Sequence, residues 1–279
     1  MKGLGYRKFK NYFFSSLCTV MTLCGLFFLA FILTDIIIHG INGVNIELFL
    51  KDPAPAGVEG GGLRNAFIGH LFITFFAVIM GVPAGILGGT FLAEYGRNSK
   101  FAKFISIFAD IMVSVPAIIV GTFVYAIAVK PFGHFSGFAG SLALAIIMFP
   151  IVLRTTENML SLIPWSLREA AFALGAPYYK VIFQVVYRGA KAGILTGVLL
   201  SLARVIGEAA PLLFTSFNNN FFSTDMKKPI ASLTVTIFQY ATGPYDTWHT
   251  QAWAAAFVIT MTILAITITA RYIIRGIEK

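Results

Sequence analysis

The sequence predicts an all-α polytopic membrane protein, and three observations lead to that prediction. Only 12% of the residues are charged and 57% are hydrophobic, whereas an ordinary soluble domain carries about 25% charged residues. Several apolar runs reach the length of roughly 20 residues that a membrane-spanning helix needs. The alternation with a period of two that marks a β-barrel strand is absent, and a helix satisfies its own backbone polar groups in lipid.

Six apolar stretches have the length and composition of membrane spans. They cover approximately residues 17–38, 66–92, 104–129, 138–153, 190–214 and 252–274. Because the chain has 279 residues, these spans leave room for short connections but for no sizeable soluble domain. We therefore expect an N-terminal segment over 1–16, a first span with its outer loop over 17–65, and the remaining spans over 66–279.

The distribution of Lys and Arg predicts the orientation of the spans. With the N-terminus inside, 15 of the 21 basic residues fall in inner segments and five in outer segments, and Arg204 remains within a span. Because positive residues are enriched on the cytoplasmic side, both termini are expected in the cytoplasm. The basic residues flank spans instead of forming one soluble face, so the net charge of +9 predicts membrane lipid, and no nucleic acid, as a partner.

Two of the connections are longer than the rest. Residues 154–189 form an inner segment in which leucine and alanine recur near helical spacing. Here Ser166 is predicted to cap a helix, with Glu169 three residues on completing a capping box. Residues 215–251 form an outer segment. Its mixed stretch over 229–239 is expected to be interfacial or re-entrant, since irregular backbone at membrane depth needs protein or water around it.

Charged residues inside spans are the sharpest functional signal, because they are costly there and usually face a bundle interior or a watery path. Arg204 and Glu208 are four residues apart in the fifth span and are expected on one helical face. They form either a self-neutralising pair that orients the helix or a pathway site for an anion, with Glu208 tuning Arg204. Asp110, in the third span, is expected to meet a neighbouring helix or a water-filled vestibule.

Proline and glycine interrupt the second and third spans. Pro83 lies in a glycine-rich stretch, and Pro116 follows Asp110. Such breaks either line a substrate route, as broken helices do in transporters, or kink the helices for packing. The fifth span carries a row of small residues that predicts close helix packing, formed by Gly189, Gly193 and Gly197.

No enzyme signature is present in the sequence. The histidines lie scattered without metal-ligand spacing, at His39, His70, His134 and His249, and no HExxH motif occurs. The chain also lacks the Gly-x4-Gly-Lys-Ser/Thr loop that cradles ATP phosphates. We therefore expect a non-catalytic chain that binds no metal or cofactor of its own. Any ATP-driven step then needs ATP and magnesium bound by a partner subunit.

A stretch of small residues in the inner segment is a candidate docking surface. It reads Glu169-Ala170-Ala171, with Gly175 four residues further on. Its low relief suits a bulky partner ridge, with Glu169 or Arg168 pairing at the rim. The alternative is an ordinary loop helix lying on the membrane surface.

This stretch resembles the EAA loop of bacterial ABC importer permeases, which seats in a cleft of the ATPase subunit. Downstream, Val185 fits the family pattern, but Tyr187-Arg188 stands where the family has Leu-Pro. The resemblance implies a coupling loop within 154–189. Its implied ATPase-coupling residues are Arg168, Glu169, Ala170, Ala171 and Gly175.

Further stretches are similar to one branch of these permeases, the phosphate-specific PstA family. They read FLAEYG at 91–96, PAIIVG at 116–121, PIVLRTTEN at 150–158, GILTG at 193–197, ARVIGEAAPLLFT at 203–215 and STDM at 223–226. The similarity extends over about 67–274, in order and at fitting spacing. One departure is Ala209, which stands where the family pattern Gly-Glu-Thr-Ala-Pro has threonine.

The resemblance implies the six-helix transmembrane domain of a type I ABC importer, placed in the bacterial inner membrane and importing inorganic phosphate. It also implies a second permease, PstC, two PstB ATPase subunits and a periplasmic phosphate-binding protein, PstS. With the charges discussed above, it makes Arg204, Glu208 and Asp110 the candidate pathway residues.

Other functions stay open at this point. An ion-driven secondary transporter or channel acting alone would use Asp110 and Glu208 as a proton relay. A membrane scaffold without a pathway is a third class, against which the Arg204–Glu208 pair argues. A permease for another oxyanion would share every ABC feature, because phosphate is fixed mainly by the resemblance.

Overall fold

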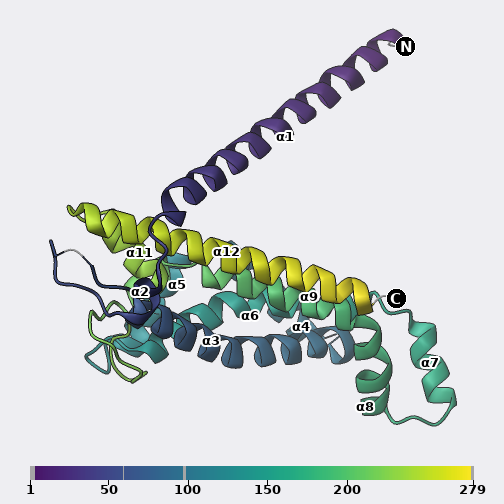
Figure 1. The fold of residues 1–279 in the computed structure, drawn as a ribbon. Helices are drawn as coiled ribbons and strands as arrows, with labels where there is room; N and C mark the ends of the chain where they lie inside the picture. The colour runs from purple at the N-terminus through teal and green to yellow at the C-terminus, as the bar shows by residue number, and fades with distance from the viewer. Residues whose placement is uncertain (1–3, 59, 97–98, 278–279) are drawn as a thin grey trace.

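The computed structural model of the chain describes residues 4–58, 60–96 and 99–277. Every regular element in these ranges is helical. Five helical segments are long and apolar enough to cross a membrane, and the bent pair Lys100–Ser114 and Ala117–Val129 makes up a sixth. The predicted all-α architecture of six membrane spans is therefore confirmed (Figure 1).

The centre of the bundle is the helix pair α3 (Arg64–Thr90) and α6 (Gly137–Ser161). Glycine lets their backbones approach closely: a Cβ on Gly85 would lie 2.7 Å from the Val152 Cβ, and one on Gly89 would overlap the Leu153 carbonyl oxygen. The helix α6 also packs against α9 (Tyr187–Ile206). There Gly193 and Gly197 admit α6 side chains, so the predicted glycine row is a packing device.

The third span is sharply broken. It consists of α4 (Lys100–Ser114), α5 (Ala117–Val124) and the π-helical turn η2 (Tyr125–Val129), with a bend of 107° between its halves. The predicted interruption of the third span at Pro116 is therefore confirmed, and the span begins at Lys100, four residues before the predicted start. Pro116 cannot donate a backbone hydrogen bond and pushes the residue before it out of the helical region, and Val115 is indeed extended, with ψ at 129°.

Two other spans have different ends from those predicted. The fourth, α6, continues eight residues past residue 153, so Arg154 lies within a helix. The fifth begins near α8 (Tyr178–Lys180), continues through η3 (Val181–Val186) into α9, and ends at Ile206. A hydropathy pattern marks where side chains become polar, whereas the end of α6 and the start of the fifth span extend beyond that point; the fifth span ends eight residues before 214, at the break before α10. The connection between the two spans shrinks to residues 162–177.

The first helix, α1 (Leu4–Ile41), stands apart from the bundle (Figure 1). Among the described helices its main contact is with the last span, α12 (Asp246–Ile277), near the C-terminal end of α1. At that contact a Cβ on Gly40 would overlap Phe257. The rest of α1 is apolar and exposed, as suits a helix surrounded by lipid or by another subunit.

The segment over 215–251, which is expected on the outer side, contains a largely buried helix, α11 (Leu233–Ala241). Nine residues of helix rise about 13 Å, which is too short to cross a membrane. The helix packs against α12 and α3. A four-residue helix, α10 (Ala210–Leu213), connects α9 to this segment, and α2 (Ile46–Leu50) lies at the same end of the bundle (Figure 1).

Candidate functional site

The candidate docking stretch forms a short helix, α7 (Trp165–Ala173), which protrudes from the bundle at the end opposite α2 (Figure 1). Its N-cap is Pro164, whose carbonyl accepts from the Leu167 backbone N–H at 3.2 Å. The prediction that Ser166 caps this helix is therefore wrong, because the chain turns two residues earlier at a proline that is pre-set for extended geometry.

Gly175 ends α7 in a way that only a few residue types permit. Its φ is +78°, in the left-handed region where a side chain is strained. The Gly175 N–H donates to the Phe172 carbonyl at 2.9 Å, and the Ala176 N–H donates to the Ala171 carbonyl at 3.1 Å. These bonds satisfy carbonyls at the helix end, so Gly175 closes α7 and returns the chain towards the bundle.

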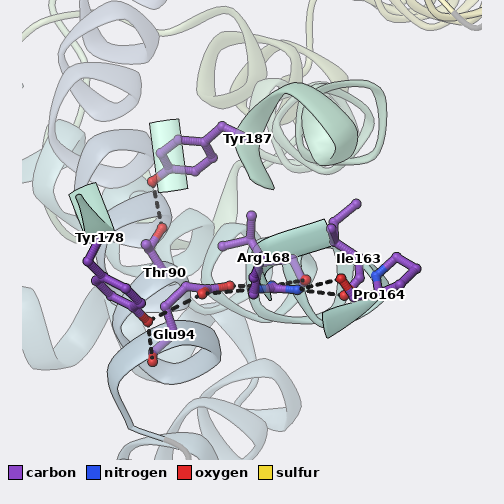
Figure 2. A network of polar contacts seen from close by, with 8 residues as sticks. Thr90, Glu94, Ile163, Pro164, Arg168, Tyr178 and Tyr187 are labelled. Carbon is purple, nitrogen blue, oxygen red and sulfur yellow. Dashed lines mark hydrogen bonds and ion pairs between the residues drawn. The ribbon is translucent and has the colours of Figure 1, made fainter. Parts of the chain in front are cut away.

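A buried ion pair fixes α7 to the end of the second span. Arg168 donates from Nη2 to Glu94 Oε1 at 2.5 Å and from Nε to Glu94 Oε2 at 3.2 Å (Figure 2). Glu94 belongs to η1 (Phe91–Tyr95), the π-helical continuation of α3. The two side chains are 5% and 1% exposed. Two parallel bonds of this kind fix orientation as well as contact.

The other donors of Arg168 close the connection from α6. Nη1 donates to the Ile163 carbonyl at 2.6 Å, and Nη2 donates to the Leu160 carbonyl at 3.1 Å (Figure 2). The guanidinium therefore joins the end of α6, the start of α7 and η1 at one point. A buried charge is tolerated when it is paired and hydrogen-bonded in this way.

Two tyrosines extend this network to the fifth span. The Tyr178 hydroxyl donates to the Glu94 carbonyl at 2.9 Å, and its ring stacks on Phe172 of α7 at 5.8 Å. The Tyr187 hydroxyl lies 2.6 Å from Thr90 Oγ1 (Figure 2). The residue that replaces leucine in the family pattern thus forms a polar contact between α9 and α3.

The outer surface of α7 and its flanks is apolar and uncovered. Leu174 is 88% exposed, Leu162 is 72% exposed, and Leu167 is half exposed. Glu169 and Ala170 are also exposed, whereas Arg168 is buried. Of the two residues expected to pair with a partner at the rim, only Glu169 is thus accessible. An exposed apolar patch with a polar edge is typical of a protein-binding surface.

Arg204 and Glu208 meet at the other end of α9. Their closest atoms, Arg204 Nε and Glu208 Oε1, are 3.6 Å apart. The prediction that both lie on one helical face is wrong in one respect: α9 ends at Ile206, so Glu208 lies in the break before α10. The pairing itself is confirmed.

Arg204 borders an open cavity of about 270 Å³ at the bend of the third span. The other lining residues are apolar and come from α4, α5 and α6; they are Phe108, Ile111, Met112, Val113, Val115, Ala117, Ile119, Val120, Phe123, Ile146, Ile147 and Ile151. The Arg204 side chain is 44% exposed. A guanidinium held at an apolar groove has donors to offer to an anion.

Asp110 belongs to a different cluster. It receives two hydrogen bonds from Arg154 of α6, one of them from Nε to Oδ1 at 2.6 Å. Arg154 also pairs with Glu157 at 2.6 Å and bonds Ser106. The expected partner on a neighbouring helix therefore exists, and the structure does not bring Asp110 together with Arg204 and Glu208.

Sequence reasoning missed the partners Arg154 and Glu94. The apolar run stops just before Arg154, so hydropathy alone places this residue in a connection. Glu94 lies in the FLAEYG stretch, whose similarity to a family indicated importance but gave no contact. The available signal was a glutamate ending an otherwise apolar span, which needs a cation nearby when it is buried.

Comparisons with known proteins extend over most of the chain. The family described as "Binding-protein-dependent transport system inner membrane component" matches residues 81–279. A phosphate transport system permease protein PstA of Haemophilus influenzae is 49% identical over 95% of this chain and 94% of its own length. A probable PstA protein of Methanocaldococcus jannaschii is 38% identical over 77% of this chain and 76% of its own.

Solved structures share the fold. A bacterial alginate ABC transporter, in complex with alginate pentasaccharide-bound periplasmic protein, has a chain that matches with a TM-score of 0.66 at 13% identity, covering 99% of this chain and 98% of that one. The MetNI methionine ABC transporter in an inward-facing conformation matches with a TM-score of 0.61 at 20% identity, covering 77% and 94%. The fold is therefore that of an ABC importer transmembrane domain.

Proposed function

The chain belongs to the binding-protein-dependent transport permease family and to its PstA branch, and on this premise we propose that it forms half of the membrane pathway of an ATP-driven importer of inorganic phosphate. The observation that supports this most strongly is the 47–49% identity to PstA proteins over 95–98% of the chain. An ion-driven transporter or channel acting alone is not favoured, because the members of this family are permease subunits.

Arg204 supplies the chemistry that phosphate needs. Phosphate is an anion near neutral pH, and a guanidinium matches its oxygens with two parallel hydrogen bonds. The 3.6 Å separation from Glu208 is longer than a direct hydrogen bond, so Arg204 keeps donors free. Glu208 competes for the same guanidinium and limits how tightly an anion is held, which suits a pathway that must release what it binds.

The α7 surface is the proposed site of coupling. An ATPase subunit covers its exposed leucines, with Glu169 at the edge, and the Arg168–Glu94 pair transmits movement of α7 to the end of α3. The proposed partners are a second permease of the PstC type, two PstB-type ATPases that bind ATP and magnesium, and a PstS-type periplasmic protein. The proposed location is the bacterial inner membrane, with both termini in the cytoplasm.

Reconstitution tests this function. The chain is incorporated into liposomes with and without these partners, and uptake of radioactive phosphate is measured with ATP inside the vesicle compartment that holds the ATPases. We expect uptake only in the full assembly and only with ATP, with sulfate as a poor competitor. Phosphate uptake by the chain alone, driven by an ion gradient, would contradict the proposal.

A further inference from the structure

The N-terminus of α11 is buried and lacks hydrogen-bond partners. Its N-cap, Ser232, is fully buried, and the Ser232 hydroxyl makes no capping bond. Within the described chain, no acceptor is present for the backbone N–H groups of Leu233, Thr234 and Val235. The serine caps of two other helices behave differently, since Ser136 accepts from α6 and Ser99 accepts from α4.

Four buried polar side chains lie near the contact between α11 and α3, and three of them are unpartnered. Ser232 and Thr236 are one turn apart on α11, and His70 and Thr74 are one turn apart on α3. All four are more than 90% buried; the three hydroxyls have no hydrogen-bond partner in the described chain, and the His70 ring has no well-formed hydrogen bond, only a weak one to the Ile206 backbone. The two helices touch beside them, because a Cβ on Gly69 would overlap the Ala231 carbonyl oxygen.

This region adjoins the break that holds Glu208. The His70 ring lies against the backbone of Ile206, the last residue of α9. On α11, the Thr234 hydroxyl donates to the Glu208 carbonyl at 3.0 Å. The Glu208 carboxylate itself is engaged with Arg204. The unpartnered groups are thus joined to the Arg204–Glu208 region through two contacts, His70 with Ile206 and Thr234 with Glu208.

Unpartnered groups at this density are unusual. Buried polar groups in folded proteins nearly always have a partner in protein, water or ligand. Elsewhere in this chain helical threonines donate to the carbonyl four residues back, as Thr155, Thr196 and Thr260 do. The hydroxyl and imidazole groups near the α3–α11 contact can donate hydrogen bonds, and Ser232 stands at the positive end of α11, where anions bind favourably.

We propose that the N-terminus of α11, with Ser232, Thr236, His70 and Thr74, is a second binding station for a tetrahedral oxyanion, next to Arg204. This inference rests on the proposed function, in which the oxyanion is phosphate. Neutral hydroxyl, imidazole and backbone donors hold an anion less tightly than a guanidinium does, so the station passes phosphate on. It becomes accessible when α3 and α11 separate at Gly69 and Ala231.

The test uses the full complex in lipid nanodiscs and in liposomes. The double variant Ser232→Ala/Thr236→Val removes two donors while nearly keeping side-chain volume, and Thr236→Val alone serves if the double variant fails to fold. The matched control is Thr260→Val, which removes a hydroxyl that is already satisfied within α12. Thermal unfolding is measured with inorganic phosphate and with sulfate, and the KM for phosphate uptake is measured beside it.

In the wild type and the control, phosphate is expected to raise the Tm. In the double variant this phosphate-induced rise is smaller, because Arg204 still binds phosphate, and the KM increases at least about tenfold, the factor for one lost hydrogen bond to a charged group. If the groups hold water only, the double variant shifts Tm equally with and without phosphate and leaves KM unchanged, which overturns the station. If the wild-type complex takes up no phosphate at all, the proposed function fails instead.

Discussion

Arg168 and Glu94 are separated by 74 residues in the chain, yet they form the most deeply buried ion pair of the described structure. Replacing both partners of such a pair by apolar residues is often nearly neutral, whereas removing one partner leaves an uncompensated buried charge. The pair therefore makes the position of α7 depend on both residues at once.

The first prediction concerns this dependence. Arg168→Met is expected to destabilise the chain by about 3–5 kcal/mol, because it strands the Glu94 carboxylate, and the double variant Arg168→Met/Glu94→Gln should recover some of that loss. Thermal unfolding of the purified complex measures both. Arg188→Met is the control, since Arg188 is an exposed residue of the same inner region. Equal stability of Arg168→Met and the control would contradict the prediction.

The second prediction concerns Arg204. Arg204→Gln should abolish phosphate uptake while the complex still assembles, because glutamine offers neither the charge nor the paired donors of guanidinium. Uptake into liposomes and co-purification of the ATPase are measured on the same preparation. Arg271→Gln, at an exposed site on α12, should transport normally. Normal uptake by Arg204→Gln would remove Arg204 from the pathway.

Sequence spacing predicted one of three ion pairs and missed the other two. Arg204 and Glu208 could be paired in advance because four residues is one helical turn, and the pair survives although the helix ends between them. Asp110 and Arg154 lie 44 residues apart, and Arg168 and Glu94 lie 74 apart. No local rule connects such residues; only the packing of α4 on α6, and of α7 against η3, brings them together.

At the level of elements, α7 shows how a short motif encodes a shape. Glycine at position 175 has φ at +78° and open space around it, so no neighbouring atom excludes a side chain there. The backbone angle at residue 175, and not a lack of space, therefore favours glycine. It explains why the motif keeps a glycine four residues after its alanines, which the sequence marked only as a family feature.

The third prediction follows from that conformation. Gly175→Leu should weaken ATPase association, because a left-handed residue with a branched side chain costs about 1–2 kcal/mol and shifts the end of α7. Gly175→Asn should retain association, since asparagine tolerates this conformation. Co-purification of the ATPase with each variant is the measurement. If both variants lose the ATPase equally, the requirement is for space at residue 175 and not for its backbone angle.

Three prolines in the spans differ in whether the helix continues through them. Pro83 and Pro150 lie inside α3 and α6, which continue through them, whereas Pro116 stands at a 107° bend. The residue type is the same in all three. The difference comes from packing, because Gly121 of α5 lies directly against Pro211 of α10, and this contact directs α5 away from the axis of α4.

For the whole molecule, the number, order and approximate places of the spans followed from hydropathy alone. What hydropathy could not supply was the separation between α1 and the bundle. An apolar helix reads the same whether it packs on its own chain, on another subunit or on lipid, so only the structure shows that the main buried clusters draw on α3, α5, α6, α9, α11 and α12.

The fourth prediction is that the bundle, and not α1, determines the thermal stability of the isolated chain. Phe27→Ala on α1 should leave the thermal unfolding of the isolated chain nearly unchanged, since Phe27 is 65% exposed. Ile73→Ala on α3, where the side chain is fully buried, should cost about 2–5 kcal/mol. Unfolding is measured in detergent for both. A comparable loss from Phe27→Ala would mean that α1 folds back onto the bundle.

The pairing of α3 with α7 through Glu94 has a mechanical consequence. The helix α3 rises about 40 Å over its 27 residues, with the Arg168 anchor just beyond one end and the Gly69–Ala231 contact near the other. Because the helix is long, a tilt of about 5° about its anchored end would displace the far end by about 3 Å. If a bound partner moves α7, the end of α3 anchored through Glu94 moves with it, and the backbone contact at Gly69 lies on the same helix.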